Sequence, residues 1–181
     1  LGTAAKKSEE AGVDAVIVSG DRDLLQLATE KIMIRMPKTK RGVTEIENYH
    51  AQDVKDAYQV TPSQIIELKA LMGDASDNIP GVPGIGEKTA TNLIVAYGTI
   101  ENAYAHVEEI KPNRAKEALK NHYDMAKMSK ELATICLEAP LTLSFEDARL
   151  TNLYTPEAYE WCRKLNFKKL LGRFEEAEAG K

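Results

Sequence analysis

The sequence predicts an α/β protein in which a small piece of sheet, residues 1–49, precedes a mostly helical region. A short apolar run rich in β-branched residues lies at 15–19, and an alternating run follows at 32–36. Strand signals then disappear from residue 50 onward. At 181 residues the chain is long enough for one domain with its own core, or for two small lobes that share one.

Residues 1–49 are expected to alternate between helix and strand, with a polar turn at 38–42 before the last strand. Gly12 is a suitable C-cap for the first helix. The expected elements are a helix over 3–11, a strand over 15–19, a helix over 23–29 and strands over 32–36 and 43–46.

Residues 50–148 form the predicted helical region, 149–174 a C-terminal helix and 175–181 a tail or linker. Thr61 and Pro62 supply an N-cap and a first helical residue, and Gly73 ends that helix. The expected helices cover 51–58, 61–73, 88–97, 100–107, 114–137 and 155–174.

Composition limits the function classes. Hydrophobic residues make up 43% of the chain and charged residues 29%, which is typical of a globular protein. The net charge of −4 argues against a protein that coats nucleic acid through bulk charge, although a nuclease site is itself acidic. No apolar run approaches membrane length and no leader pattern is visible, so we expect a cytoplasmic protein without a membrane partner. Cys136 and Cys162 lack the spacing of a zinc site or a disulfide framework.

The first candidate site is SGDRD at 19–23, which follows the strand at 15–19. Ligand sites in open α/β sheets lie at the carboxyl ends of strands, so Asp21 and Asp23 are expected to share one site there. In the alternative interpretation, Asp21 only caps the helix that follows.

The second candidate site is the pair Asp74 and Asp77, in LMGDASDNIPGVPGIGEKTAT at 71–91. Carboxylates are hard oxygen ligands of the kind that Mg²⁺ and Mn²⁺ prefer. Together with Asp21 and Asp23 they predict a two-cation site suited to in-line attack on a phosphodiester. The alternative is that Asp74 ends a helix and Asp77 caps a turn.

The segment at 79–90 predicts a glycine-rich hairpin between two helices. Gly84 and Gly86 allow the backbone to approach a phosphate, and the amides of Glu87 to Thr89 open the next helix, where Lys88 adds positive charge. Val82 and Ile85 are expected to plug the turn into the helices behind it. Phosphate contacts of this kind do not depend on base sequence.

These motifs resemble the 5′ nuclease family of 5′→3′ exonucleases and flap endonucleases, most closely the branch at the N-terminus of bacterial DNA polymerase I. The resemblance runs through SGDRDLLQL at 19–27, the segment at 60–90 and SKELATI at 129–135. It implies a PIN-like sheet and, at 61–97, a helix-hairpin-helix of the helix-three-turn-helix type that grips duplex DNA. It also implies two-metal hydrolysis with Mg²⁺ or Mn²⁺ at 5′ ends or flaps, in replication and repair.

The resemblance further implies particular residue roles. Asp21 and Asp23 correspond to ligands of the first metal, and Asp74 and Asp77 to ligands of the second. K⁺ is often held by carbonyls of the hairpin turn in this family, and Val82 and Ile85 are the candidates here.

In the family, an E-A-D-D run precedes LGT, whereas this sequence opens at Leu1. The run, a first strand with its aspartate and a helical arch are therefore expected to be missing. We expect a fragment that binds DNA and cleaves it poorly or not at all alone, and the missing strand suggests strand exchange or dimerisation.

Two other functions compete with this interpretation. A helix-hairpin-helix module that binds duplex DNA without cutting it would not need the four aspartates to converge. A PIN-like ribonuclease would share the strand-end aspartates, but would not be expected to carry the hairpin.

Overall fold

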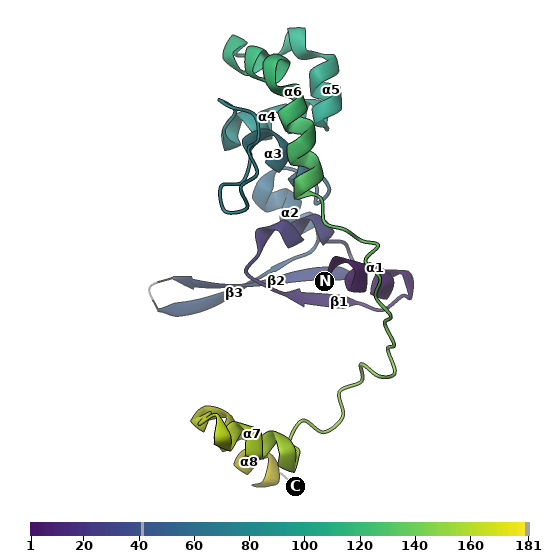
Figure 1. Cartoon of the computed structure of the whole chain (residues 1–181), viewed down its shortest axis with the longest axis vertical. Helices are drawn as coiled ribbons and strands as arrows, with labels where there is room; N and C mark the ends of the chain where they lie inside the picture. The colour runs from purple at the N-terminus through teal and green to yellow at the C-terminus, as the bar shows by residue number, and fades with distance from the viewer. Residues whose placement is uncertain (41, 180–181) are drawn as a thin grey trace. The chain divides into compact units, whose positions relative to one another are not determined.

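The computed structural model describes residues 1–40 and 42–179 and divides the chain into two units, Leu1–Leu141 and Thr142–Lys181. The first unit joins a small sheet to a group of helices (Figure 1). The elements, in chain order, are α1 (Gly2–Glu10), β1 (Ala15–Val18), the 3₁₀ helix η1 (Arg22–Leu27), β2 (Ile32–Lys40), β3 (Val43–Tyr49), α2 (Ala51–Tyr58), α3 (Gln64–Met72), α4 (Glu87–Tyr97), α5 (Ile100–Ala105), η2 (Val107–Glu109), α6 (Asn113–Ala133), α7 (Pro156–Lys164) and α8 (Lys168–Ala179).

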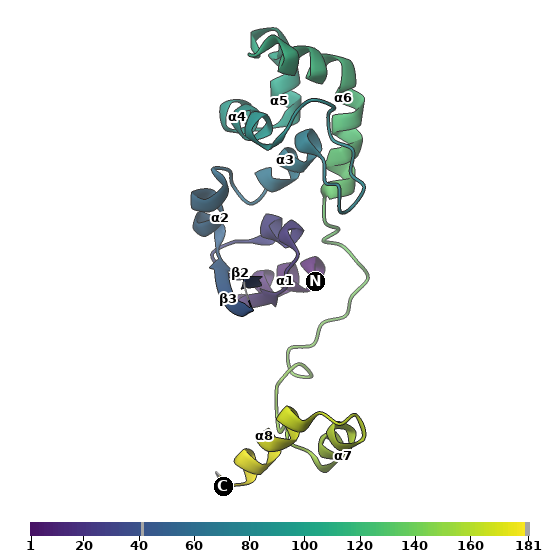
Figure 2. The ribbon, with the colours of Figure 1, turned by 90° about the vertical axis from the view of Figure 1, so that its left-hand side faces the viewer.

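The described sheet has the order β1-β2-β3, with β1 parallel and β3 antiparallel to β2. Alternate residues bury one of its faces: Ile17 and Ile34 lie in the core, whereas Val16 and Val18 are exposed. α1 packs on β1 and η1 packs on β2 (Figure 2). η1 follows β1 directly in the chain, so it starts beyond the carboxyl end of β1.

The helices from α3 to α6 form the second part of this unit. α3 packs against α4 and α6, and its contact with η1 joins the helices to the sheet region. Ala70, Leu71, Ile94 and Leu119 are among the completely buried side chains of this core. α3 is therefore apolar on most sides, as a helix enclosed by others must be.

The predicted element order is confirmed in type, with several local differences. β2 extends through residues 38–40, into the segment expected as a polar turn at 38–42. The helix expected over 100–107 ends at Ala105, and the 3₁₀ helix η2 follows it. The segment expected as a helix over 23–29 is the 3₁₀ helix η1. α6 ends at Ala133 instead of continuing to 137, because the Gln26 side chain accepts from the Ile135 N–H and donates to the Ala133 carbonyl. This long-range contact competes with the next turn of helix.

The helix expected over 155–174 is two helices, α7 and α8. Asn166 has φ 57°, and the N–H groups of Asn166 and Phe167 donate to the carbonyls of Arg163 and Cys162. This pattern is a Schellman motif, which ends α7. α8 then continues through the first part of the expected tail to Ala179, and residues 180 and 181 lie outside the described residues.

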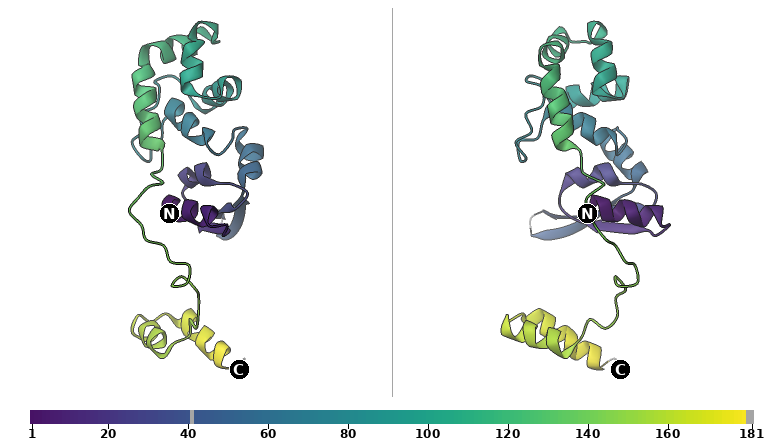
Figure 3. Two further views of the ribbon diagram at one scale, coloured as in Figure 1. Left: turned by 90° about the vertical axis from the view of Figure 1, so that its right-hand side faces the viewer. Right: turned by 45° about the vertical axis from the view of Figure 1, so that its right-hand side comes forward.

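The second unit consists of α7 and α8 with the preceding segment from Thr142 (Figure 3). Its aromatic contacts are edge-on, with the ring of Phe174 5.1 Å from Tyr154 and 5.5 Å from Tyr159 between centroids. None of the helices in the described part of the chain is both long and apolar enough to cross a membrane.

Candidate metal centre and phosphate-binding loop

A pocket of about 480 Å³ lies where η1, α3 and the loop after α3 meet. Its polar side is lined by residues from two distant segments, 20–23 and 74–77. Its apolar side includes Tyr58, Leu68 and Met72. The pocket therefore combines an acidic end with an apolar wall.

Asp23 reaches this pocket from the first turn of η1, with 17% of its side chain exposed. The turn is fixed by Asp21, whose carboxylate accepts from the Asp23 N–H at 2.9 Å. Asp21 thus caps η1, the role that the sequence offered as the alternative to metal binding. It also lines the pocket, although it is not part of the carboxylate cluster described below.

Asp74 is held by the loop that follows α3. Its N–H and carbonyl exchange hydrogen bonds of 2.9 Å with Ile79, which closes residues 74–79 into a tight loop. The Ser76 N–H donates to the Asp74 carboxylate at 2.9 Å, and the Ser76 hydroxyl hydrogen-bonds to the same oxygen. These contacts fix the direction of the Asp74 side chain.

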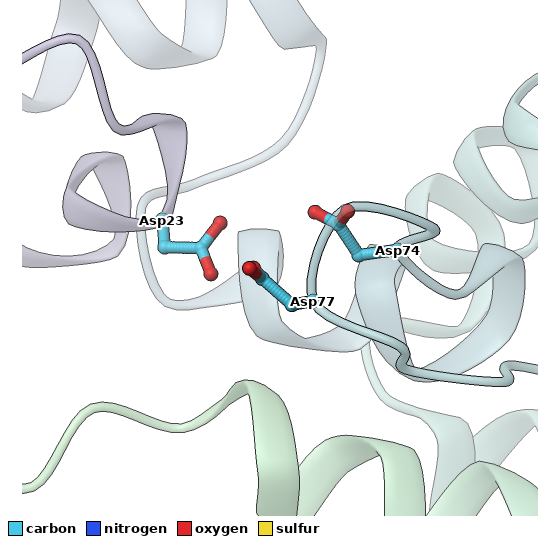
Figure 4. Close-up of side chains that lie close together, drawn as sticks. All are labelled: Asp23, Asp74 and Asp77. Carbon is cyan, nitrogen blue, oxygen red and sulfur yellow. The ribbon is translucent and has the colours of Figure 1, made fainter.

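Three of the four predicted carboxylates come together. Asp23, Asp74 and Asp77 each offer an oxygen atom, and these atoms all lie within 4.8 Å of one another. In Figure 4, Asp23 comes from one segment, while Asp74 and Asp77 project from the same loop toward it. Three carboxylates in this arrangement are the donor type that a hard divalent cation requires.

Lys69 of α3 is buried beside two of these carboxylates. Its ammonium forms ion pairs with Asp23 and, at 2.6 Å, with Asp74. Only 5% of the lysine is exposed, and buried lysines are rare unless they are paired. The ammonium therefore compensates the like charges that would otherwise repel one another across the pocket.

These neighbours lower the pKa of Asp74. Hydrogen bonds from Lys69, and next from Ser76, hold the pKa of the Asp74 carboxyl well below its usual range, against the opposing effect of burial. The carboxylate is thus ionised at neutral pH and serves as a ligand or charge partner. It is unsuited to donating a proton.

The loop between α3 and α4, residues 73–86, is held on its buried side by packing and by hydrogen bonds to α3 and α6. Val82 and Ile85 are buried, at 2% and 3% exposure, which confirms that they plug the turn. The Val82 N–H donates to the Leu71 carbonyl at 2.7 Å, and the Val82 carbonyl accepts from the Ile85 N–H at 3.0 Å. The buried Ser129 of α6 accepts from the Gly81 N–H at 3.0 Å, which ties the loop to α6.

The opposite side of this loop is open at the start of α4. Gly84 has φ 89°, a conformation that favours glycine. A Cβ on Gly86 would meet no atom within 4 Å, and Gly86 caps α4 without a side-chain hydrogen bond. Glu87, Lys88 and Thr89 form the first turn of α4, in which Glu87 and Lys88 are exposed and Thr89 is half-buried. The predicted phosphate-binding residues therefore share one accessible backbone surface.

Residues 60–155 match the family model for the 5′-3′ exonuclease, C-terminal SAM fold. This match covers more than half of the chain. The chain belongs to the 5′-3′ exonuclease family. The resemblance inferred from its motifs and the predicted α/β fold class are thereby confirmed.

Relatives of this chain include bacterial DNA polymerases I. The chain is 44% identical over 175 residues to DNA polymerase I of Bacillus caldotenax, and 41% identical over 179 residues to that of Bacillus subtilis (strain 168). These alignments cover 97% and 99% of the chain, but 20% of each relative. The chain thus spans about a fifth of the length of these curated relatives.

Solved structures of phage T5 nucleases share the fold of part of this chain. A T5 5′-exonuclease with bound divalent zinc ions superposes with a TM-score of 0.61 and 27% identity, over 73% of this chain and 48% of that one. A T5 flap endonuclease, in a complex with DNA and metal ions, gives a TM-score of 0.62 and 26% identity, over 73% and 47%.

The motifs identified the carboxylates of this site, but not the residues that hold them. Lys69, Ser76 and Ser129 emerge only from the structure. A sequence signal existed for Lys69, because it is a lone lysine within the apolar helix α3 and a buried lysine requires an acidic partner nearby. Ser76 and Ser129 have no such signal.

Proposed function

We propose that this chain is part of a structure-specific 5′ nuclease of the DNA polymerase I type. The protein that contains it would hydrolyse phosphodiester bonds at 5′ ends or flaps of duplex DNA, in replication and repair. The observation that carries this proposal is the convergence of Asp23, Asp74 and Asp77 in one pocket. Asp74 and Asp77 belong to the same loop as the glycine-rich turn.

The three clustered carboxylates are the proposed ligands for Mg²⁺ or Mn²⁺. Their oxygens are hard donors and Asp74 is already ionised, so the donor set fits such a cation. Asp21 is proposed as a further ligand from its place in the motif, and its carboxylate would have to leave the cap of η1. A bound divalent cation supplies charge stabilisation and an activated water in phosphodiester hydrolysis. The task of these residues is to ligate and position.

The exposed backbone of Gly84 and Gly86 and the first turn of α4 are proposed to hold a phosphate of the duplex. Lys88 adds charge there, whereas Glu87 contributes its amide. K⁺ is proposed to bind at the Val82 and Ile85 carbonyls. The Val82 oxygen already accepts the Ile85 N–H, and a carbonyl oxygen can accept a second partner.

Metal binding is tested on the chain with Mn²⁺ and the electron paramagnetic resonance signal of the free ion. Asp77→Asn is the sharpest variant, because within the described residues the Asp77 side chain has no hydrogen bond or ion pair whose loss would disturb the fold. We expect it to weaken Mn²⁺ binding at least about tenfold, whereas Asp56→Asn on α2, outside the pocket, should leave it unchanged. Equal Mn²⁺ binding by both variants would show that the pocket is not the metal site.

Cleavage is tested with Mg²⁺ and a labelled 5′-flap duplex, in parallel on the chain alone and on a longer protein that contains it. The longer protein should cleave, and its Asp77→Asn variant should lose most cleavage but keep duplex binding. The chain alone should bind the duplex and cut it slowly, since only three carboxylates converge. Rapid cleavage by the chain alone would contradict that last expectation.

A second candidate is a module that binds duplex DNA without cutting it. Lys69 favours it, because the ammonium already neutralises Asp23 and Asp74. Duplex binding without any Mn²⁺ binding at the pocket would support this candidate over the nuclease.

A further inference from the structure

Arg114, in the first turn of α6, lies against the glycine-rich loop. A Cβ on Gly84 would be 3.7 Å from Nε and 3.8 Å from Nη2 of Arg114. The guanidinium thus lies beside the exposed backbone of Gly84, and it comes from a residue 30 positions further along the chain. Arg114 itself is exposed.

Arg114 is not ion-paired within the described residues, whereas two neighbouring lysines on α6 are. Lys116 and Lys120 both pair with Glu108, at 3.4 Å and 2.6 Å. Within the described part of the chain, Arg114 forms no such ion pair, and the first turn of α6 contains no acidic residue. Within the residues that the structure describes, no acceptor bonds to its guanidinium N–H donors, so they can bind an external acceptor.

The start of α6 also lies beside the first turns of α4. Lys111 and Pro112 line a small pocket of about 180 Å³ together with Thr89 and Asn92 of α4. The segment just before Arg114 thus brings a second cationic side chain, Lys111, beside α4. An extended polyanion that contacts the loop would pass both of them.

We propose that Arg114 binds a backbone phosphate of the duplex strand that the α3–α4 loop holds. This inference rests on the duplex binding proposed above. A guanidinium fork matches two oxygens of one phosphate, whereas a lysine acts as a point charge. Arg114 is then a positioning residue that fixes the strand on the loop without reading its sequence.

The test is binding of the 181-residue chain to a fluorescein-labelled blunt duplex, measured by anisotropy in EDTA at several NaCl concentrations. Arg114→Gln and Arg114→Ala should raise Kd about threefold to tenfold and lower the slope of log K against log salt by about 1. Arg114→Lys should fall between them and the original chain. Lys120→Ala removes the same charge from α6 at an ion-paired site, so it should change Kd less than about twofold.

The outcomes separate the two proposals. Duplex binding by the original chain with unchanged Kd in both Arg114→Gln and Arg114→Ala would overturn the role of Arg114 alone. Equal weakening by Lys120→Ala would also overturn it, because the effect would then be general electrostatics. Absence of duplex binding by the original chain would overturn the proposed duplex binding and this inference together. Circular dichroism of each variant checks the fold.

Discussion

Gly73 and Gly81 lie back to back in the α3–α4 loop: a Cβ on Gly81 would come within 2.3 Å of the backbone nitrogen of Gly73. Both residues have positive φ, 73° and 63°. The contact brings the two ends of residues 73–81 together, and Asp74 pairs with Ile79 inside that closure. The position of Asp74, a candidate metal ligand, therefore depends on two glycines that are not themselves part of the candidate metal site.

Gly81→Ala should be strongly destabilising. The new methyl group would clash with backbone, which cannot move aside as a flexible side chain could, and the positive φ adds strain. We expect a loss of about 3 kcal/mol or more in the free energy of unfolding, measured by urea denaturation followed by circular dichroism. Gly86→Ala is the matched control, since its Cβ meets open space and φ is −95°, and it should cost no more than about 1 kcal/mol. Similar losses for both variants would contradict the steric argument.

Ser129→Ala should destabilise the protein by removing the hydrogen bond that ties the same loop to α6. The variant leaves the buried Gly81 N–H without its acceptor, and an unsatisfied buried donor costs about 1 to 3 kcal/mol. Urea denaturation measures the loss. Ser63→Ala, at an exposed hydroxyl that hydrogen-bonds with Thr61 and with no other residue that the structure describes, should change stability by less than about 0.5 kcal/mol. A Ser129 variant as stable as the Ser63 variant would show that water replaces the hydroxyl.

The element order was predictable from the sequence because local periodicity determines it. The strand at 15–18, the first part of β2 at 32–36 and the helix at 51–58 follow directly from alternation, apolar spacing and caps. The continuation of β2 through residues 38–40, where a polar turn was expected, depends on its pairing with β3. The break at Asn166 was not predicted. Asn166 adopts the left-handed conformation between α7 and α8, and no glycine or proline, the usual sequence signals of a helix end, stands there. The early end of α6 was missed because Gln26, more than 100 residues away, competes for its last backbone groups.

The candidate site shows the same division between local and long-range information. Asp74 and Asp77 are close in sequence, so their proximity could be read directly. The approach of Asp23 depends on the packing of η1 on α3, which the motif resemblance implied and which spacing alone does not give. The ion pairs of Lys69 with Asp23 and Asp74 depend on that same packing, so the sequence alone does not identify its partners.

Lys69→Met should destabilise the chain in the absence of divalent metal. The substitution removes the cation that pairs with Asp23 and Asp74 and leaves their carboxylates close together, which costs about 2 to 4 kcal/mol for a largely buried pair. Thermal unfolding in EDTA measures this loss. Lys55→Met, at an exposed lysine of α2, should have little effect.

Added Mn²⁺ should recover much of the stability of the Lys69→Met variant, because a divalent cation in the pocket replaces the lost positive charge. The recovery should exceed the stabilisation of the original chain by the same Mn²⁺ concentration, since the ammonium no longer competes. A variant that is destabilised but insensitive to Mn²⁺ would indicate that the carboxylates bind no metal.

The low pKa of Asp74 predicts how stability depends on acid. The pKa of the carboxyl is lower in the folded protein than its value of about 3.9 in an unfolded chain, so the unfolded state binds more protons as the pH falls below about 4. The stabilisation by the ionised carboxylate is complete above that pH and is lost as the pH falls toward the folded pKa. Asp74→Asn should therefore be less stable near neutral pH and show a shallower loss of stability between about pH 4 and pH 2.

Ser76→Ala tests the same dependence without removing the carboxylate. It deletes the hydroxyl that bonds to Asp74 but keeps the Ser76 backbone donor and Lys69, so the slope should lie between those of the original protein and Asp74→Asn. Urea denaturation at a series of acid pH values gives all three slopes. An Asp74→Asn variant that retained the slope of the original protein would show that other carboxylates govern acid unfolding, and that Lys69 and Ser76 do not stabilise the fold through Asp74.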